Sequence, residues 1–438
     1  MAMVFIAGGG YVGMYSALNL KRRAPTGTEI TLVAPESNMT YQPFLPEAAS
    51  GSIEPRHVVI PLRTVLKGVR LITGRVTAIH HPAKRATVVP VEGDAYEIDY
   101  DILVLGVGSL SRVLPVPGLA EYAVGFKTVA EAIYLRNQVL SRMDAAESTP
   151  DEKIRKRALT FTFVGGGYAG VEALAELEDL ARDACRYYST VTRDDMRWVL
   201  VEAADGILPE IGKGLGDYAL ERLRARGIEV HLNTRLESAQ DGVMKLSTGE
   251  VFESETLVWT TGVKAHPLVS TVAPAPDKAG RIEVDEYLRV KGLDDVWAAG
   301  DCAAVPDVTT GGICPPTAQH ALRQARRLGR NVAAVLKKQE PQPFRYRNRG
   351  GLVSLGRYKG VARIPGMRIR GFPAWFLHRT YHVFMIPTIN RKARVLADWT
   401  VALFFKRDVV QLGSLAYPRA AIDEATASVQ LTREESPK

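Results

Sequence analysis

The chain of 438 residues is 46% hydrophobic and 24% charged, which is typical of a globular protein with two or three domains. Its three cysteines, Cys185, Cys302 and Cys314, are too unevenly spaced for a secreted disulfide framework or a zinc site, so we expect a reducing compartment and no metal. The formal net charge of +8 would suit nucleic-acid binding, but the positive charge is concentrated in one C-terminal segment rich in apolar residues.

The chain begins with a glycine-rich fingerprint. Residues 3–7 predict a buried parallel strand and residues 11–22 a helix. Between them lies the run Gly8-Gly9-Gly10-Tyr11-Val12-Gly13, whose glycines allow a tight turn, close approach to a pyrophosphate, and close packing of helix on strand. The run therefore predicts a dinucleotide site at the helix N-terminus. No apolar leader precedes the strand, so we expect no signal peptide.

The next elements extend the same domain. Residues 29–33 predict its second strand, and residues 101–106 predict a strand that returns to the sheet. The acidic residue that commonly binds a ribose at the end of the second strand is displaced by Ala34 and Pro35 to Glu36. Residues 113–118, with two prolines, predict a crossover out of this domain.

A second fingerprint follows 157 residues after the first. Residues 129–146 predict a helix, and Gly165, Gly167 and Gly170 lie between a predicted strand at 161–164 and a predicted helix at 171–183. A single fingerprint is weak evidence, but two strand–glycine–helix units in one chain indicate two dinucleotide sites.

The second unit carries its acidic residue in register. The predicted strand 197–201 runs directly into Glu202, where a carboxylate accepts hydrogen bonds from ribose hydroxyls and repels a 2′-phosphate. This position favours NADH over NADPH, and a solvated surface glutamate is the alternative. Residues 213–226 predict a helix and 256–260 the closing strand, after which 295–301 predict a return to the first unit.

This order of elements predicts an α/β fold with two Rossmann-like dinucleotide-binding domains, the second inserted in the first. We expect the first domain to comprise residues 1–112 and 265–340, the second 113–264, and a C-terminal segment 341–438. No Cys-x-x-Cys lies near either fingerprint. We therefore expect a flavin that works without a disulfide relay, which excludes reductases that need two thiols beside the flavin.

The C-terminal segment is basic and amphipathic. Residues 343–407 contain 14 Lys or Arg and one acidic residue, Asp398, so this stretch carries +13 and the rest of the chain −5. Residues 391–407 place Val395, Leu396, Trp399, Ala402 and Leu403 at helical spacing between basic ends. This pattern predicts membrane-surface contact through residues about 370–407, and no apolar run reaches the roughly 18 residues of a transmembrane helix. A helix packed on the protein core or on the partner of a homodimer is the alternative.

Several motifs together resemble the type II NADH dehydrogenases, the single-subunit, non-proton-pumping NADH:quinone oxidoreductases of the flavoprotein disulfide oxidoreductase superfamily. Besides the two fingerprints, the resemblance rests on Tyr41-Gln42-Pro43-Phe44-Leu45-Pro46, Trp259-Thr260-Thr261-Gly262-Val263, Ala299-Gly300-Asp301 and Pro316-Thr317-Ala318-Gln319. It implies FAD, NAD(H), a membrane quinone (menaquinone or ubiquinone) as acceptor, and a peripheral place on the cytoplasmic face of the cell membrane.

The resemblance also assigns residues to the two cofactors. It places Gly8, Gly9, Gly10, Gly13 and Asp301 at FAD, with the N-terminus of a helix starting near Thr317 and Ala318 facing the flavin, where its positive end would stabilise the reduced anion. It places Gly165, Gly167, Gly170 and Glu202 at NADH. Further cofactor contacts are expected from Glu36, Val76, Gly108 and Gly262.

Two residues are expected to act in the reaction. Glu172 would orient the nicotinamide or pass protons to the quinone; a helix N-terminal carboxylate complementing the dipole is the alternative. Gln319 matches the first glutamine of the family's Ala-Gln-x-Ala-x-Gln quinone motif, but Arg323 replaces the second, with Gln324 beside it. We expect His320 and His378 to be structural or surface groups and Lys359 to be a solvated cation.

Two other functions remain open from the sequence. One is a soluble FAD-dependent NADH reductase that serves a ferredoxin-like protein or a small-molecule acceptor. The other is a slowly reacting flavoprotein with an interaction or signalling role.

Overall fold

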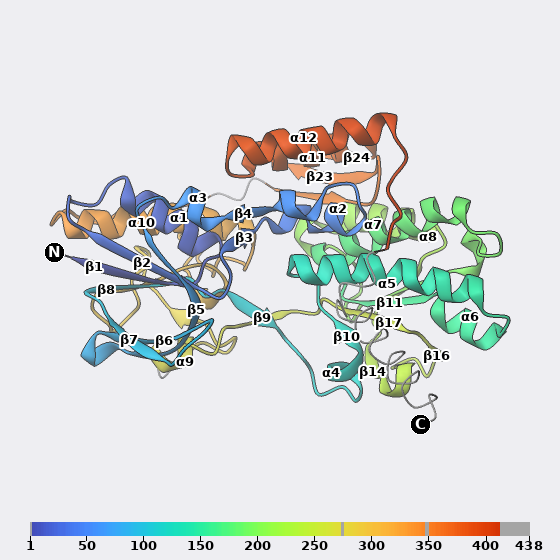
Figure 1. The fold of residues 1–438 in the computed structure, drawn as a ribbon, viewed down its shortest axis with the longest axis horizontal. Helices are drawn as coiled ribbons and strands as arrows, with labels where there is room; N and C mark the ends of the chain where they lie inside the picture. The colour runs from blue at the N-terminus through green and yellow to red at the C-terminus, as the bar shows by residue number, and fades with distance from the viewer. Residues whose placement is uncertain (1, 273–275, 347–349, 412–438) are drawn as a thin grey trace, which may run out of the picture.

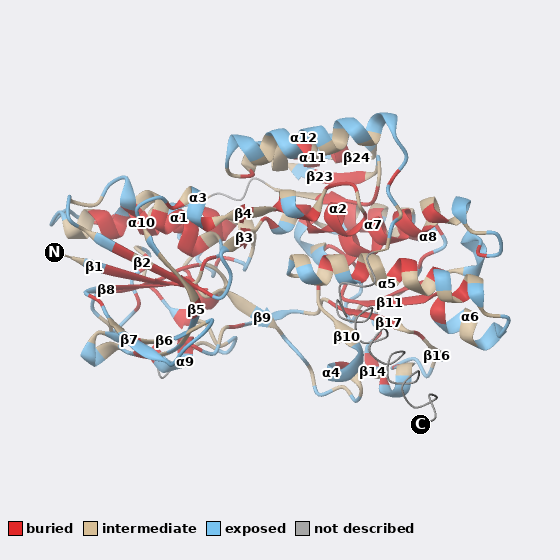
Figure 2. Cartoon of the chain, in the orientation of Figure 1, coloured by how far each residue is buried: buried red, intermediate tan, exposed pale blue. Residues whose placement is uncertain are grey.

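The computed structural model describes residues 2–272, 276–346 and 350–411. Two α/β lobes lie side by side, and the C-terminal segment forms a third layer above α2 (Leu45–Ala49) and α7 (Tyr168–Ala184), as Figure 1 shows. The elements of the predicted α/β architecture are present. The interior strands of both lobes are buried (Figure 2).

The first lobe is built on a seven-stranded sheet in the order β20-β8-β1-β2-β5-β6-β7. Its strands are β1 (Met3–Ala7), β2 (Glu29–Ala34), β5 (Arg70–His80), β6 (Arg85–Pro90), β7 (Tyr96–Asp99), β8 (Ile102–Leu105) and β20 (Val296–Ala298). β20 pairs in parallel with β8, which confirms that the chain returns to its first sheet after the second lobe. Helices α1 (Tyr11–Lys21) and α10 (Ala318–Leu336) pack on each other beside this sheet (Figure 1).

The second lobe contains a five-stranded parallel sheet in the order β10-β17-β11-β12-β13. Its strands are β10 (Ala123–Val124), β11 (Thr160–Val164), β12 (Arg197–Val201), β13 (Glu229–His231) and β17 (Thr256–Trp259). Its helices are α5 (Val129–Ser148), α6 (Glu152–Ala158), α7 and α8 (Lys213–Arg224). Val164 pairs with Val201, so the second glycine turn and Glu202 leave the sheet at the same edge.

Two antiparallel strands join the lobes. β9 (Ser109–Ser111) leads out of the first lobe and pairs with β18 (Val263–Ala265), which leads back. β9 is drawn crossing between the lobes in Figure 1. Smaller elements complete them: α3 (Leu62–Val65), α4 (Leu119–Tyr122), α9 (Val269–Val272), and the strands β3 (Asn38–Thr40), β4 (Val59–Pro61), β14 (Leu236–Ser238), β15 (Val243–Leu246), β16 (Val251–Glu253), β19 (Ile282–Glu283) and β21 (Ala303–Ala304).

The C-terminal layer consists of an antiparallel sheet and two helices. The sheet contains β22 (Gly351–Ser354), β23 (Gly360–Ile364) and β24 (Met367–Arg370), and the helices are α11 (Phe372–Met385) and α12 (Ile389–Phe404). α12 ends before Arg407, which is buried instead of forming the solvated basic end that the sequence predicts. In the described ranges, no helix combines the length and the apolar character that crossing a bilayer demands.

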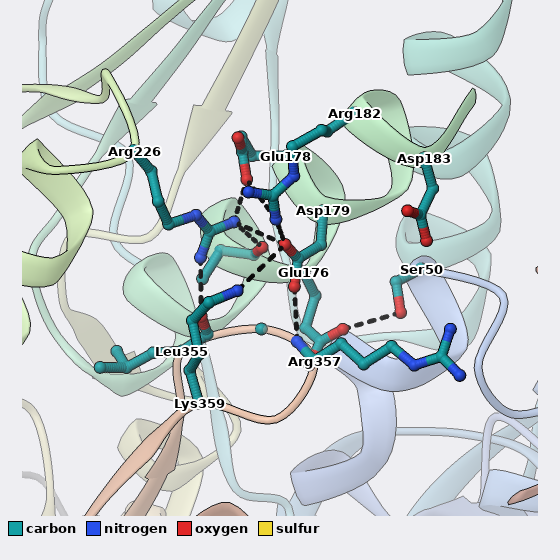
Figure 3. A network of polar contacts seen from close by, with 12 residues as sticks. Ser50, Glu176, Glu178, Asp179, Arg182, Asp183, Arg226, Leu355, Arg357 and Lys359 are labelled. Carbon is teal, nitrogen blue, oxygen red and sulfur yellow. Dashed lines mark hydrogen bonds and ion pairs between the residues drawn. The ribbon is translucent and has the colours of Figure 1, made fainter. Parts of the chain in front are cut away.

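A buried polar network fastens the layer to α7 (Figure 3). Arg226 donates to Glu178 and to the carbonyl of Leu355 in the turn after β22. The backbone N–H of Arg357 donates to Asp179 at 2.5 Å, and Nζ of Lys359 lies 3.8 Å from the same carboxylate. Lys359 is therefore not the freely solvated cation that the sequence predicts, and burial lowers its pKa to about 8.

Candidate functional site

The two glycine fingerprints have the same local geometry. Gly8 and Gly165 adopt φ values of +106° and +116°, which L side chains rarely reach. A Cβ on Gly13 would collide with the carbonyl oxygen of Gly8, and a Cβ on Gly170 with that of Gly165. Both turns therefore require glycine at their first and last positions.

The middle glycine of each turn faces open space. A Cβ on Gly10 or on Gly167 would meet no atom within 4 Å. These residues are the N-caps of α1 and α7, and no side chain caps either helix. Backbone N–H groups at both helix starts are thus arranged as a pyrophosphate requires, and the residues present fit one dinucleotide on each lobe.

An acidic residue lies beside each turn. Glu202 accepts hydrogen bonds from the N–H groups of Gly166 at 2.5 Å and Ala204 at 2.7 Å, so its position is fixed. Glu36 is exposed, and the carbonyl oxygen of Glu36 is 3.9 Å from where a Cβ of Gly9 would lie. The backbone of Glu36 therefore passes close to Gly9, whereas Glu202 reaches the second turn with its carboxylate.

Asp301 lies at the carboxyl end of β20, on the same edge of the first sheet as the Gly8 turn. Oγ of Ser109 donates to its carboxylate at 2.7 Å, and Nζ of Lys127 is 2.9 Å from the same hydroxyl. Burial lowers the pKa of Lys127, although Asp301 acts in the opposite direction. Ser109 and Lys127 carry no motif and could not be found from the sequence.

Of three further predicted cofactor positions, two lie in loops and one lies within a strand. Gly108, after β8, and Gly262, before β18, have φ values of +70° and +68° and open space at the Cβ position. Val76 lies in β5, three residues after Thr73. Thr73 pairs with Ala34 at the end of β2. Gly108 and Gly262 thus lie beyond the carboxyl ends of β8 and β17, where ligands bind in doubly wound sheets, whereas Val76 lies within β5 and pairs with Val88 of β6.

The N-terminus of α10 carries the predicted acceptor residues. Thr317 is its N-cap, but the side-chain Oγ1 is 2.7 Å from Nδ1 of His320 and does not cap the helix. Gln319 accepts a hydrogen bond from the hydroxyl of Tyr346 at 3.1 Å, and the guanidinium of Arg323 lies 4.4 Å from the same ring's centroid. Gln319 and Arg323 therefore share one aromatic partner that the sequence did not single out.

Gln324, next to Arg323, has a different role. Its side-chain oxygen accepts a hydrogen bond from the backbone N–H of Gly300 at 2.8 Å, and the residue is buried. This contact holds the turn that presents Asp301. The side-chain oxygen of Gln324 is thus hydrogen-bonded within the protein. Gln324 therefore does not replace the missing second glutamine of the motif.

Glu172 is buried on α7 and contacts the C-terminal layer. Its Oε1 accepts the N–H of Ser354 at 2.8 Å and lies 3.4 Å from Nε2 of His378 on α11. The prediction that His378 is a structural or surface group therefore overlooked its pairing with Glu172. The two residues are separated by 206 positions in the printed sequence, so only the fold brings them together.

A second histidine continues from His378. The rings of His378 and His382 are 4.5 Å apart between centroids, and Nδ1 of His382 is 3.1 Å from the hydroxyl of Tyr41. Burial, and next the neighbouring His378, lower the pKa of His382 well below its usual value. Burial raises the pKa of Tyr41. The aromatic stretch at residues 41–46 thus meets α11 at this point.

The three cysteines are all free. Burial raises the pKa of Cys302 and that of Cys314 to about 11, which disfavours the nucleophilic thiolate. None of the three thiols is paired in a disulfide within the described part of the chain. Glu229, His231 and Glu250 could together hold a cation, but Arg197 already pairs with both carboxylates.

Comparisons with known proteins agree with this geometry. The model of the pyridine nucleotide-disulphide oxidoreductase family matches residues 2–325. The type II NADH:quinone oxidoreductase Ndh of Mycobacterium tuberculosis is 31% identical over 419 residues, covering 92% of this chain and 88% of the relative. A type II NADH:quinone oxidoreductase of Staphylococcus epidermidis is 31% identical, with coverages of 86% and 93%.

A solved structure has the same fold. The structure of NDH2 from Plasmodium falciparum in complex with NADH superposes with a TM-score of 0.87 at 18% identity, covering 93% of this chain and 99% of that one. Both fingerprints lie within the range that the family model matches, and the relatives extend over most of the remaining chain. The chain therefore belongs to the pyridine nucleotide-disulphide oxidoreductase family and, within it, to the type II NADH:quinone oxidoreductases.

Proposed function

We infer that the protein oxidises NADH through FAD and passes two electrons to a quinone, without a redox disulfide and without pumping protons. The observation that carries this inference is the pair of open glycine turns, one on each lobe, in a chain whose three thiols are all free. FAD, when bound, accepts hydride from nicotinamide and transfers electrons singly or in pairs to the acceptor. The protein's own residues supply binding, orientation and electrostatics.

We propose the following roles at FAD. Gly8, Gly10 and Gly13 bind the pyrophosphate, and Asp301, held by Ser109, binds nearby at the carboxyl edge of the sheet. The N-terminus of α10 lies after Thr317, where its backbone N–H groups stabilise negative charge on the flavin. Glu36, Val76, Gly108 and Gly262 contribute further contacts.

At NADH, Gly165, Gly167 and Gly170 bind the pyrophosphate and Glu202 binds the adenosine ribose. The carboxylate of Glu202 already receives two backbone N–H groups, which fixes its charge close to the turn. That charge would repel the 2′-phosphate of NADPH, so we propose a preference for NADH.

We propose that Glu172 and His378 hold a proton between them. Nε2 of His378 is placed to donate to Oε1 of Glu172, and the backbone of Ser354 orients the same oxygen. The next polar contact from His378 is made by His382, also on α11, whose ring nitrogen lies beside the hydroxyl of Tyr41. Gln319 and Arg323, which both contact Tyr346, are the proposed contacts to the quinone head group.

We also propose a division of the chain and a membrane-facing surface. The domains are residues 1–112 with 265–340 for FAD, 113–264 for NADH, and 341–438 for the membrane and a possible homodimer contact. Exposed apolar side chains gather on α11 and α12, among them Phe372, Phe376, Phe384, Ile389, Leu403 and Phe404. This surface, with its basic neighbours, fits the anionic interface on the cytoplasmic face of a membrane.

Steady-state assays test the activity and flotation tests the surface. We expect NADH oxidation by a soluble quinone analogue, faster than with NADPH, and flotation with vesicles that contain anionic lipid. Turnover with ferredoxin but not with quinone would contradict the assignment. Vesicle binding unchanged after Phe384→Ser and Phe404→Ser together would contradict the membrane surface.

A further inference from the structure

A small cavity lies beneath the C-terminal layer, apart from both fingerprints. It has a volume of about 30 Å³, against the ~10–15 Å³ that one water molecule needs. Its walls come from the end of α2, the turn between β22 and β23, and helices α11 and α12. It is lined by Gly51, Ser52, Arg357, Tyr358, Trp375, Arg379, Trp399, Ala402, Leu403 and Arg407.

The lining contains three arginines and no acidic residue. Nitrogen donors from three of these residues have no acceptor in the described part of the chain: Nη1 and Nη2 of Arg407, Nε of Arg379, and Nε1 of Trp375. The side chain of Arg407 is only 3% exposed, so its guanidinium is almost fully removed from bulk solvent. Buried donors of this kind require acceptors, because an unmet charged donor costs free energy.

The neighbouring contacts fix the guanidinium groups in place. The ring of Trp375 lies 4.1 Å and that of Trp399 lies 4.6 Å from the guanidinium carbon of Arg379, which packs between them. Nη2 of Arg379 contacts Glu47 at 2.8 Å, and Nη2 of Arg357 donates to the carbonyl of Ala402 at 2.7 Å. The donors are therefore held before any ligand arrives, which reduces the entropy lost on binding.

Two of the three lining arginines contact a carboxylate, and the third contacts a backbone carbonyl. Of the carboxylates outside the lining, Glu47 contacts Arg379 and Asp183 lies 3.8 Å from Nε of Arg407. Glu176 also favours the charged form of Arg407, whereas Arg357 disfavours it. Arg357 therefore keeps its full positive charge beside the cavity, since its contact is the neutral carbonyl of Ala402.

We propose that this cavity binds the phosphate group of a phosphodiester or of free phosphate. A tetrahedral oxyanion offers acceptors in several directions, and arginine forks bind phosphate oxygens in pairs. The lining includes neither Gln319 nor Arg323, the proposed quinone contacts, so the cavity differs from the proposed acceptor site. Leu403 of the lining also belongs to the exposed apolar surface of α12, so an anionic phospholipid could present its phosphate here while its chains remain in the membrane.

Binding to the full-length holoenzyme tests this proposal without using turnover. Inorganic phosphate is titrated against chloride at constant ionic strength, and dihexanoyl phosphatidylglycerol is titrated below its micelle concentration, with thermal unfolding and calorimetry as readouts. We expect saturable binding of at least one probe. If inorganic phosphate binds, free phosphate is a sufficient ligand for the cavity. If only the lipid binds, the ligand is the phosphate of a lipid head group.

The variants Arg407→Gln and Lys406→Gln form a matched pair. Both remove one positive charge from adjacent positions, but Lys406 is exposed and does not line the cavity. We expect affinity to fall about tenfold or more in Arg407→Gln, since a charged donor is lost, and to change less than about twofold in Lys406→Gln. Arg357→Gln repeats the test if Arg407→Gln does not fold. Absence of phosphate-specific binding in the unmodified protein, or equal losses in Arg407→Gln and Lys406→Gln, would overturn the proposal.

Discussion

Oε1 of Glu172 on α7 lies 3.4 Å from Nε2 of His378 on α11, and both side chains are buried. The contact joins the helix that begins at the second fingerprint to the C-terminal layer. It places an acid–base pair between the nucleotide lobe and the surface proposed to face the membrane. If the pair acts as proposed, its loss should affect turnover with quinone.

Replacing His378 should slow the quinone half of the reaction. In His378→Asn, Glu172 keeps the N–H of Ser354 but loses its proton donor. We expect kcat with quinone to fall by about a hundredfold, the lower end of the range for general acid–base catalysis. The rate of flavin reduction by NADH should remain within about threefold of the unmodified protein, since hydride transfer needs no proton from this pair. Equal losses in both half-reactions would instead indicate a structural role for His378.

The two last glycines of the fingerprints form a matched test of cofactor assignment. Gly13→Ala places a Cβ against the carbonyl of Gly8, and Gly170→Ala places one against the carbonyl of Gly165. We expect Gly13→Ala to lose FAD, measured by flavin absorbance of the purified protein. Gly170→Ala should retain FAD and raise the KM for NADH about tenfold or more. Loss of flavin from Gly170→Ala alone would reverse the assignment of the lobes.

Glu202→Gln should weaken discrimination between the two nicotinamide cofactors. The variant retains an oxygen for the N–H of Gly166 but removes the charge that repels a 2′-phosphate. We expect the ratio of kcat/KM for NADH over NADPH to fall by about tenfold or more. An unchanged ratio would support the alternative that Glu202 is only a solvated carboxylate.

The network of Figure 3 should dominate the stability of the C-terminal layer. Arg226→Met leaves Glu178 and Asp179 buried without one of their cationic partners. Breaking a buried pair in this way costs roughly 3–5 kcal/mol, which denaturant unfolding can measure. Arg222→Met is the control, because its partner Glu221 is exposed on the same helix, and it should cost less than about 1 kcal/mol.

His382 should contribute to the loss of stability in acid. Burial and His378 lower its pKa in the folded state, so between that pKa and the unfolded value near 6.5 the unfolded chain binds more protons. Stability therefore falls as the pH drops below about 6.5, by up to about 1.4 kcal/mol per pH unit from this group. His382→Phe should flatten this slope, whereas His80→Phe at an exposed position should leave it unchanged. Equal slopes in the unmodified protein and His382→Phe would contradict the effect.

Local sequence patterns predicted the elements that depend on neighbouring residues. The strand before Gly8 and the strand before Glu202 end where their apolar runs stop, as predicted. The return of residues 296–298 to the first sheet was also predictable, because the chain repeats a strand-like apolar run there. The conformations of the fingerprint glycines could be predicted without the structure, because the fingerprint itself implies them.

Long-range pairings could not be predicted in the same way. Ser109 meets Asp301 and Tyr346 meets Gln319 only after the strands and helices have packed, and neither serine nor tyrosine has a local signature of that contact. The sequence predicts Arg407 as part of the basic end of an amphipathic helix. In the structure the chain turns inward after α12, and Arg407 is buried. Each of these outcomes depends on tertiary packing and not on residue spacing.

Anaerobic stopped-flow mixing tests electron transfer from NADH through FAD to quinone most directly. NADH is mixed with the oxidised holoenzyme, and a quinone analogue is added after the flavin absorbance near 450 nm has bleached. We expect rapid bleaching followed by full recovery of the oxidised spectrum at a rate that supports steady-state turnover. Rapid bleaching with a persistent reduced flavin or charge-transfer complex after quinone addition would contradict the proposed function.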